Sequence, residues 1–189
     1  MNPVIINEKY PILLFKNFKI PENQVKDELI KKIITEKISK GPSYTEALSF
    51  PIQIDYKNFL FDLYDEFVEI SKKHLKKFTI SDSNIKRYWA YATNRFDPHY
   101  QWHDHIKSST INGVYYLKIP ESATGQLDFL YNDIFFRFAP KENDLLIMPN
   151  YLEHAPRQPL SDDFRISINI EVVCNEDPND IFYDYVKFD

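Results

Sequence analysis

The stretch "QWHDHIKSSTINGVYYLKIP", residues 101–120, places two histidines one residue apart, just ahead of an aromatic and β-branched run. Residues of that second type favour the pleated surface of a sheet, so the run predicts a β-strand. In a strand, side chains at positions i and i+2 face the same side. A strand that includes the histidines would therefore turn His103 and His105 to one side and Asp104 to the other. Two imidazoles on one face can share a metal ion.

Short β-like runs of the same kind fill the chain after residue 84. Turn-forming Pro, Asn, Asp and Gly separate them, which predicts an antiparallel sandwich or barrel. Before residue 84, apolar residues recur at helical intervals in two segments, and a proline-containing apolar segment predicts an edge strand or two short strands. We expect a mainly β fold in which N-terminal helices pack on a double-stranded β-helix, or jelly roll. The expected strands are residues 4–18, 85–94, 99–105, 110–120, 125–131, 134–140, 144–149 and 164–173; the expected helices are 21–39 and 56–78, with a loop over 41–55.

Length and composition limit the classes of protein to consider. A chain of 189 residues fits one domain, with 1–84 as support, 85–175 as the jelly-roll core and 176–189 as a C-terminal extension. The net charge of −5, with the lysines of 72–78 on a predicted helix, argues against nucleic-acid binding. A single cysteine, Cys174, excludes an internal disulfide and fits a cytoplasmic protein. No apolar run approaches the roughly 18 to 20 residues of a membrane span. We expect a small-molecule or peptidyl substrate, and a homodimer is left open.

A third histidine and an arginine extend the candidate site. His154 follows the predicted strand 144–149 and a proline turn, and a jelly roll would fold that strand back beside the first. Arg165 opens the last predicted strand, where alternation gives one polar face (Arg165, Ser167, Asn169) and one apolar, core-facing set (Phe164, Ile166, Ile168). An arginine that looks into a barrel can bind a carboxylate through two hydrogen bonds, and Ser167 would add a hydroxyl. The alternatives are histidines without a metal and an arginine exposed on the strand.

The ordered motifs "HDH", "INGVYYLKIP", "GQLDF", "DLLIMPNYLEHAP" and "FRISINI" resemble the 2-oxoglutarate- and Fe(II)-dependent oxygenases. The similarity covers about residues 85–173 and is to a microbial and phage branch that reads H-x-H, S-G-V-Y-Y-L, P-x-x-L-x-H and R-I-S. It implies an enzyme that uses Fe(II), 2-oxoglutarate and O₂, hydroxylates its substrate and releases succinate.

The resemblance also implies roles for individual residues. His103 and His154 would hold iron. Arg165 and Ser167 would bind the distal carboxylate of 2-oxoglutarate, with Tyr116 against the same group. Aromatic and polar residues near the motifs are weaker candidates for lining the substrate cavity, since aromatic residues in a β-rich core more often serve packing: Trp102, Tyr91, Tyr100 and Asn169, with Trp89 and Phe129.

The second metal ligand departs from the wider superfamily, which has H-x-D or H-x-E and so a triad of two histidines and one carboxylate. Here His105 stands in place of the acid. Either the site has three histidines, or a bulge turns Asp104 inward as the ligand. Asn112, where the branch often has serine, is a smaller departure.

Two other functions remain open. A cupin-type enzyme also has a jelly roll and three histidines and needs no 2-oxoglutarate, but cupins usually place a glutamate soon after the H-x-H pair, and "IKSSTIN" has none. A non-catalytic jelly roll with incidental histidines is the third alternative.

Overall fold

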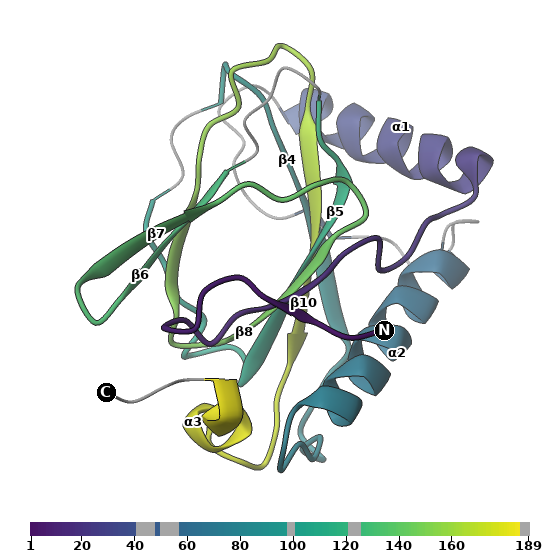
Figure 1. Ribbon diagram of the computed structural model, residues 1–189. Helices are drawn as coiled ribbons and strands as arrows, with labels where there is room; N and C mark the ends of the chain where they lie inside the picture. The colour runs from purple at the N-terminus through teal and green to yellow at the C-terminus, as the bar shows by residue number, and fades with distance from the viewer. Residues whose placement is uncertain (41–47, 50–56, 98–100, 121–125, 186–189) are drawn as a thin grey trace.

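Two antiparallel sheets and two long helices form the protein (Figure 1). The computed structural model describes residues 1–40, 48–49, 57–97, 101–120 and 126–185. A seven-stranded sheet has the order β1-β2-β8-β5-β10-β4-β3, and a three-stranded sheet has the order β7-β6-β9. The elements are β1 (Val4–Ile5), β2 (Leu13–Phe15), α1 (Asn23–Lys40), β3 (Leu48–Ser49), α2 (Lys57–His74), β4 (Arg87–Thr93), β5 (Ile111–Lys118), β6 (Leu127–Tyr131), β7 (Ile134–Phe138), β8 (Leu145–Pro149), β9 (Glu153–Pro156), β10 (Arg165–Val172), α3 (Pro178–Ile181) and the 3-10 turn η1 (Tyr183–Tyr185).

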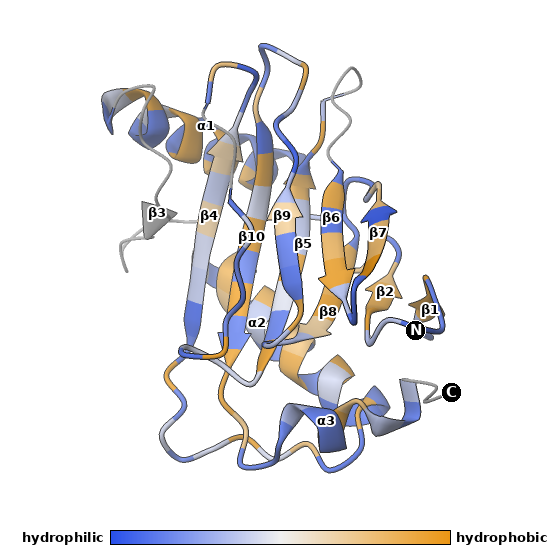
Figure 2. Cartoon of the chain, turned by 90° about the vertical axis from the view of Figure 1, so that its left-hand side faces the viewer, coloured by the Kyte–Doolittle hydropathy of each residue, from blue (hydrophilic) through white to orange (hydrophobic). Residues whose placement is uncertain are grey.

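The large sheet is covered on both faces. Helices α1 and α2 lie against one face, and the three-stranded sheet lies on the other side (Figure 1). Seen from that other side, β9, β6 and β7 lie side by side in front of the large sheet (Figure 2). Each central strand of the large sheet therefore has one face toward the helices and one toward the small sheet.

Alternation along β10 separates these two faces. Ile166, Ile168 and Ile170 are buried in the apolar core shared with the helices, where full burial of each such side chain stabilises the fold by about 1.5–3 kcal/mol. The opposite face of β10 is polar and begins with Arg165 and Ser167. The predicted assignment of Ile166 and Ile168 to the core is confirmed.

Gly113 in β5 allows α2 to pack closely on the large sheet. A Cβ atom at this position would lie 2.6 Å from the ring of Phe67 in α2, which is shorter than real carbon contacts. The ring fills the space that any larger residue on β5 would need. The close approach helps to bury Phe67 completely.

The predicted elements agree with the structure in type, with the following corrections. Helix α2 ends at His74 rather than at 78, and Lys77 has a left-handed φ of 51°, which does not continue a helix. A short strand, β3, lies within the predicted loop 41–55. The strand predicted over 99–105 is absent from its described part, where residues 101–105 have one isolated β-bridge at His103. Strand β9 and the short helix α3 were not predicted.

None of the described helices combines the length and the apolar character that crossing a bilayer requires.

Candidate functional site

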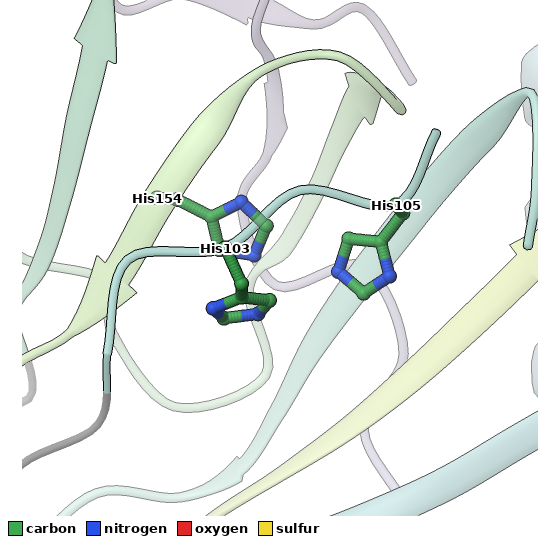
Figure 3. A group of neighbouring side chains, drawn as sticks. All are labelled: His103, His105 and His154. Atoms are coloured by element: carbon green, nitrogen blue, oxygen red, sulfur yellow. The ribbon is translucent and has the colours of Figure 1, made fainter. Parts of the chain in front are cut away.

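Three imidazoles converge in the space between the two sheets. His103, His105 and His154 each present a nitrogen, and these three nitrogens lie within 4.8 Å of one another. The ring centroids are 4.3 Å apart for His103 and His154, and 5.3 Å apart for each of the other two pairs. His103 and His105 come from the loop that precedes β5, and His154 comes from β9 (Figure 3).

Backbone hydrogen bonds, not a continuous strand, bring the histidines together. His103 and His154 form an antiparallel bridge in which each N–H donates to the other's carbonyl, at 3.1 and 3.0 Å. The N–H of His105 donates to the carbonyl of Asn150 at 2.8 Å. The loop is thus tied at two points to the segment that carries His154. The histidines converge as predicted, but these hydrogen bonds bring them together and not the alternation of a β-strand.

The hydrogen-bond partners of the rings define which nitrogen can hold a metal. Nδ1 of His103 lies 3.0 Å from the carbonyl of Gln101, and Nδ1 of His154 lies 2.9 Å from the carbonyl of Leu152. Nδ1 of His105 lies 2.9 Å from Oε1 of Glu171. A carbonyl and a carboxylate only accept hydrogen bonds, so we assign the proton of each neutral ring to Nδ1. Nε2 then carries the lone pair that a metal ion requires.

Burial keeps two of the rings neutral. Loss of hydration, reinforced by the charge that His103 would carry, lowers the pKa of His154 to about 3. Burial also lowers the pKa of His103 below its usual value. Since a protonated imidazole cannot coordinate a metal, these shifts keep both residues ready to act as ligands near neutral pH. The residues therefore fit a divalent metal ion.

Asp104, the alternative second ligand, lies outside this cluster. Its side chain is exposed, and its Oδ1 accepts a hydrogen bond of 3.1 Å from the N–H of Ile106. The carboxylate is engaged in a local turn of the loop. The structure therefore brings His105, and not Asp104, to the other two histidines.

A pocket extends from the histidines along the inner faces of β4, β5 and β10. Its space is about 500 Å³, including the part that opens to solvent. Most of the lining residues have polar side chains, while Val114 and Leu127 connect the pocket to the apolar core between the sheets. The lining residues are Tyr91, Thr93, His103, His105, Val114, Tyr116, Leu127, His154, Pro156, Arg165, Ser167 and Asn169.

Arg165 brings a buried positive charge to this pocket. It is 5% exposed, and its guanidinium donates to the carbonyl of Arg157 at 3.0 Å and to Oγ1 of Thr93 at 3.2 Å. Among the described residues, no carboxylate forms an ion pair with it. Burial lowers its pKa and raises that of the neighbouring Tyr116 hydroxyl. A buried guanidinium without an acidic partner is costly unless an anion joins it, so this end of the pocket suits a carboxylate ligand.

The other predicted site residues take different positions. Ser167, Tyr116, Tyr91 and Asn169 line the pocket with Arg165. Trp102 does not line it; this side chain is 45% exposed and packs against Phe135 with ring centroids 6.5 Å apart. Tyr100 lies outside the described residues.

Trp89 and Phe129 pack behind the histidines instead of lining the pocket. The Trp89 ring lies 6.4 Å from that of His105, and the buried Phe129 ring lies 6.2 Å from that of His154. Both aromatic residues thus support imidazoles of the cluster. The expectation that aromatic residues here would mostly serve packing fits their positions.

Among the residues of the site that the sequence did not predict are two that bear on its chemistry, Thr93 and Glu171. Both continue an inward alternation that was recognised only in part: Thr93 follows Tyr91 on β4, and Glu171 follows Asn169 on β10. Burial alone would raise the pKa of Glu171, but hydrogen bonds from His105 and Ser108 and nearby positive charge outweigh it and lower the pKa. Glu171 is therefore a buried carboxylate that stays ionised.

Comparison with known proteins identifies solved structures with a similar fold. Neither protein-family models nor curated protein sequences match the chain. Among solved structures, a prolyl-4-hydroxylase from Pseudomonas putida is similar, with a TM-score of 0.62 and 14% identity over 88% of this chain and 94% of that chain. HygX from Streptomyces hygroscopicus, solved with nickel and 2-oxoglutarate bound, has a TM-score of 0.61 and 8% identity, over 89% of this chain and 84% of HygX.

A third similar structure is SnoK, a non-heme alpha-ketoglutarate-dependent carbocyclase from nogalamycin biosynthesis. It has a TM-score of 0.58 and 6% identity, over 87% of this chain and 79% of SnoK. At identities this low, the similarity supports a shared fold but not a shared substrate or reaction. The chain therefore shares its fold with prolyl hydroxylases and with other 2-oxoglutarate-dependent oxygenases.

Proposed function

We propose that this protein is a 2-oxoglutarate-dependent non-haem iron oxygenase that hydroxylates a small-molecule or peptidyl substrate. One observation carries the proposal: the three converging imidazoles and the buried Arg165 line the same pocket. A metal site and an anion site in one cavity suit a cosubstrate that chelates a metal at one end and ends in a carboxylate at the other. The shared fold supports the same class. In this proposal the two sheets are the two halves of a double-stranded β-helix.

Each residue has a defined task in the proposed reaction. His103, His105 and His154 hold Fe(II) through Nε2, and their Nδ1 hydrogen bonds fix the rings before the metal arrives. When bound, iron supplies the activation of O₂, coupled to decarboxylation of 2-oxoglutarate to succinate. The residues of the chain bind, orient and desolvate the reactants.

The polar wall of the pocket would hold the cosubstrate. Arg165 binds the distal carboxylate through its guanidinium, and the hydroxyls of Ser167 and Tyr116 add hydrogen bonds to the same group. Ser167 pairs directly with Tyr116 across the β10–β5 ladder, which puts both residues on one short stretch of the wall. Tyr91 and Asn169 would contact the substrate, since both line the remaining part of the pocket.

An anaerobic absorption spectrum tests the proposal directly. Protein with both Fe(II) and 2-oxoglutarate should show a weak visible charge-transfer band that neither addition gives alone, and O₂ should then yield succinate. His154→Ala should lose the band because the metal loses a ligand. Asp104→Ala is the matched control and should keep it, since Asp104 lies outside the cluster. Loss of the band in Asp104→Ala would reverse the choice of second ligand.

A three-histidine oxygenase of the cupin type, which needs no 2-oxoglutarate, is the second candidate. The observation in its favour is that the three clustered groups are all imidazoles. O₂ consumption by the iron-loaded protein with a substrate but without 2-oxoglutarate would favour it. Absence of the charge-transfer band with metal bound would point the same way. Arg165 argues against it, because that reaction leaves the buried guanidinium without a role.

A further inference from the structure

Glu171 is a buried carboxylate that contacts one histidine of the cluster. It lies on β10, on the same face as Arg165, and is 5% exposed. Its Oε1 accepts a hydrogen bond of 2.9 Å from Nδ1 of His105 and one of 2.6 Å from the hydroxyl of Ser108. The guanidinium of Arg87 lies 3.9 Å from the other carboxylate oxygen. No part of the proposed reaction so far uses this residue.

The contact singles out His105 among the three histidines. The Nδ1 atoms of His103 and His154 face neutral backbone carbonyls within their own segments, two residues away in each case. The Nδ1 hydrogen bond of His105 instead goes to a charged acceptor, and that acceptor is 66 residues away in the sequence. A hydrogen bond to an ionised acceptor is about twice as strong as one between neutral groups.

The loop that carries His105 is held by the same group. Ser108, whose hydroxyl donates to Glu171, also donates its backbone N–H to the carbonyl of His105 at 3.0 Å. Glu171 therefore contacts both the ring of His105 and the turn that follows it. Residues 101–105 form no continuous strand, so the alternation of a strand does not orient the His105 ring. The hydrogen bond to the Glu171 carboxylate restrains the ring instead.

We propose that Glu171 is a positioning residue that supplies the carboxylate of this metal centre from behind His105. Its hydrogen bond holds the proton on Nδ1, turns Nε2 toward the other two histidines and makes that nitrogen a stronger ligand. The proposal rests on the proposed function, since it requires a metal at the three histidines. It also accounts for His105 at the position where the wider superfamily has an acidic metal ligand. The negative charge is then supplied by Glu171, which contacts the ligand His105 instead of the metal.

Metal titration of the intact protein tests this role. We would add Co²⁺ to metal-free protein and follow its visible ligand-field bands, in the wild type, in Glu171→Gln and in Asp144→Asn. Loss of a carboxylate behind a metal-bound histidine typically weakens metal affinity 10- to 100-fold, and we expect Glu171→Gln to fall in that range. Asp144 is a matched control because it is equally buried and accepts two hydrogen bonds from backbone N–H groups, of Asn17 and Lys141. Asp144→Asn should bind Co²⁺ as the wild type does.

A second measurement needs no metal. In long-range ¹⁵N–¹H correlation spectra of the metal-free wild type, the His105 ring in its neutral form should carry its proton on Nδ1. In Glu171→Gln, the protons of the His105 ring should shift or divide between the two nitrogens, since an amide can accept or donate. A general loss of structure would move the signals of all the histidines, including His74 on α2, whereas the proposed role moves those of His105.

The outcomes separate the two proposals. A wild type that binds no Co²⁺ at the histidines would overturn the metal site and, with it, the role of Glu171. Wild-type binding together with unchanged affinity in Glu171→Gln would overturn the role of Glu171 alone. A wild-type His105 with its proton on Nε2 would also overturn it, whatever the metal affinity.

Discussion

His154 links the stability of the metal-free protein to pH. Its pKa falls from an ordinary 6.5 to about 3 in the folded state. Between these values the unfolded chain binds a proton that the folded chain does not, so stability is complete above about pH 6.5 and declines as the pH falls toward 3. From pH 7.5 to pH 5.0, this residue alone should cost about 2 kcal/mol, since one pKa unit corresponds to about 1.4 kcal/mol. The lowered pKa of His103 acts in the same direction.

Urea unfolding in the presence of a chelator measures this effect. The wild type should lose stability between the two pH values, and His154→Gln, which has no titrating group at this position, should lose about 2 kcal/mol less. An equal loss in both proteins would show that burial of His154 does not carry the pH dependence.

Arg165 makes a separate prediction about the cosubstrate. Arg165→Lys replaces a planar, two-pronged donor by a point charge. The loss of charge-assisted hydrogen bonds of about 1.5–3 kcal/mol should weaken 2-oxoglutarate binding about tenfold to a hundredfold, measured by titrating the visible band of the iron-loaded protein. Metal affinity should stay within about twofold, because the guanidinium donates to Arg157 and Thr93 and to none of the histidines. Equal loss of both affinities would mean that Arg165 supports the fold.

The spacing of the histidines, together with the resemblance of the ordered motifs to the 2-oxoglutarate-dependent oxygenases, pointed to side chains that the structure places at one pocket. His103, His105, His154, Arg165, Ser167 and Tyr116 all lie at the pocket. Glu171 could not be identified in the same way. Its function depends on the loop conformation that brings His105 to it, and no local pattern encodes a contact across 66 residues.

At the scale of elements, the helix–sheet contact at Gly113 is the most sensitive to substitution. Gly113→Ala adds a methyl group at 2.6 Å from the Phe67 ring, and such overpacking typically costs about 1–3 kcal/mol. Chemical denaturation should show this loss, and the double variant with Phe67→Leu should recover part of it through coupling between the two positions. Simple addition of the two single losses would show that the ring and the glycine do not restrict each other.

Long elements with a clear period were predictable, whereas the short strands β3 and β9 were not. Both helices and the strands β4–β8 and β10 follow patterns of helical recurrence or of dense β-forming residues. β3, with two residues, and β9, with four, have too few residues for a period. They form because a partner strand is present: β9 pairs with β6, and β3 pairs with β4. The loop at 101–105 resembles a strand in sequence, but its described residues pair at one position only.

At the scale of the whole molecule, the candidate metal centre joins parts that are distant in sequence. The loop before β5 contributes two histidines, β9 in the small sheet contributes the third, and β10 in the large sheet holds Glu171 behind them. The overall layering followed from the sequence because apolar and polar residues alternate along β10. The way in which the two sheets meet did not, since it depends on tertiary hydrogen bonds such as the bridge between His103 and His154.

A metal held by both of these segments should stabilise the whole fold. An ion that binds only the folded state adds about 2.7 kcal/mol at a free concentration of 100 times its dissociation constant. For a domain of this size, that corresponds to a rise in Tm of roughly 5 to 10 °C. Thermal unfolding followed by circular dichroism, with Co²⁺ against a chelator, should show such a rise in the wild type and almost none in His154→Ala. Arg165→Lys is the control and should keep the full rise, because it alters the pocket without removing a ligand. A rise that persisted in His154→Ala would place the stabilising ion elsewhere on the protein and would leave the three histidines without the proposed role.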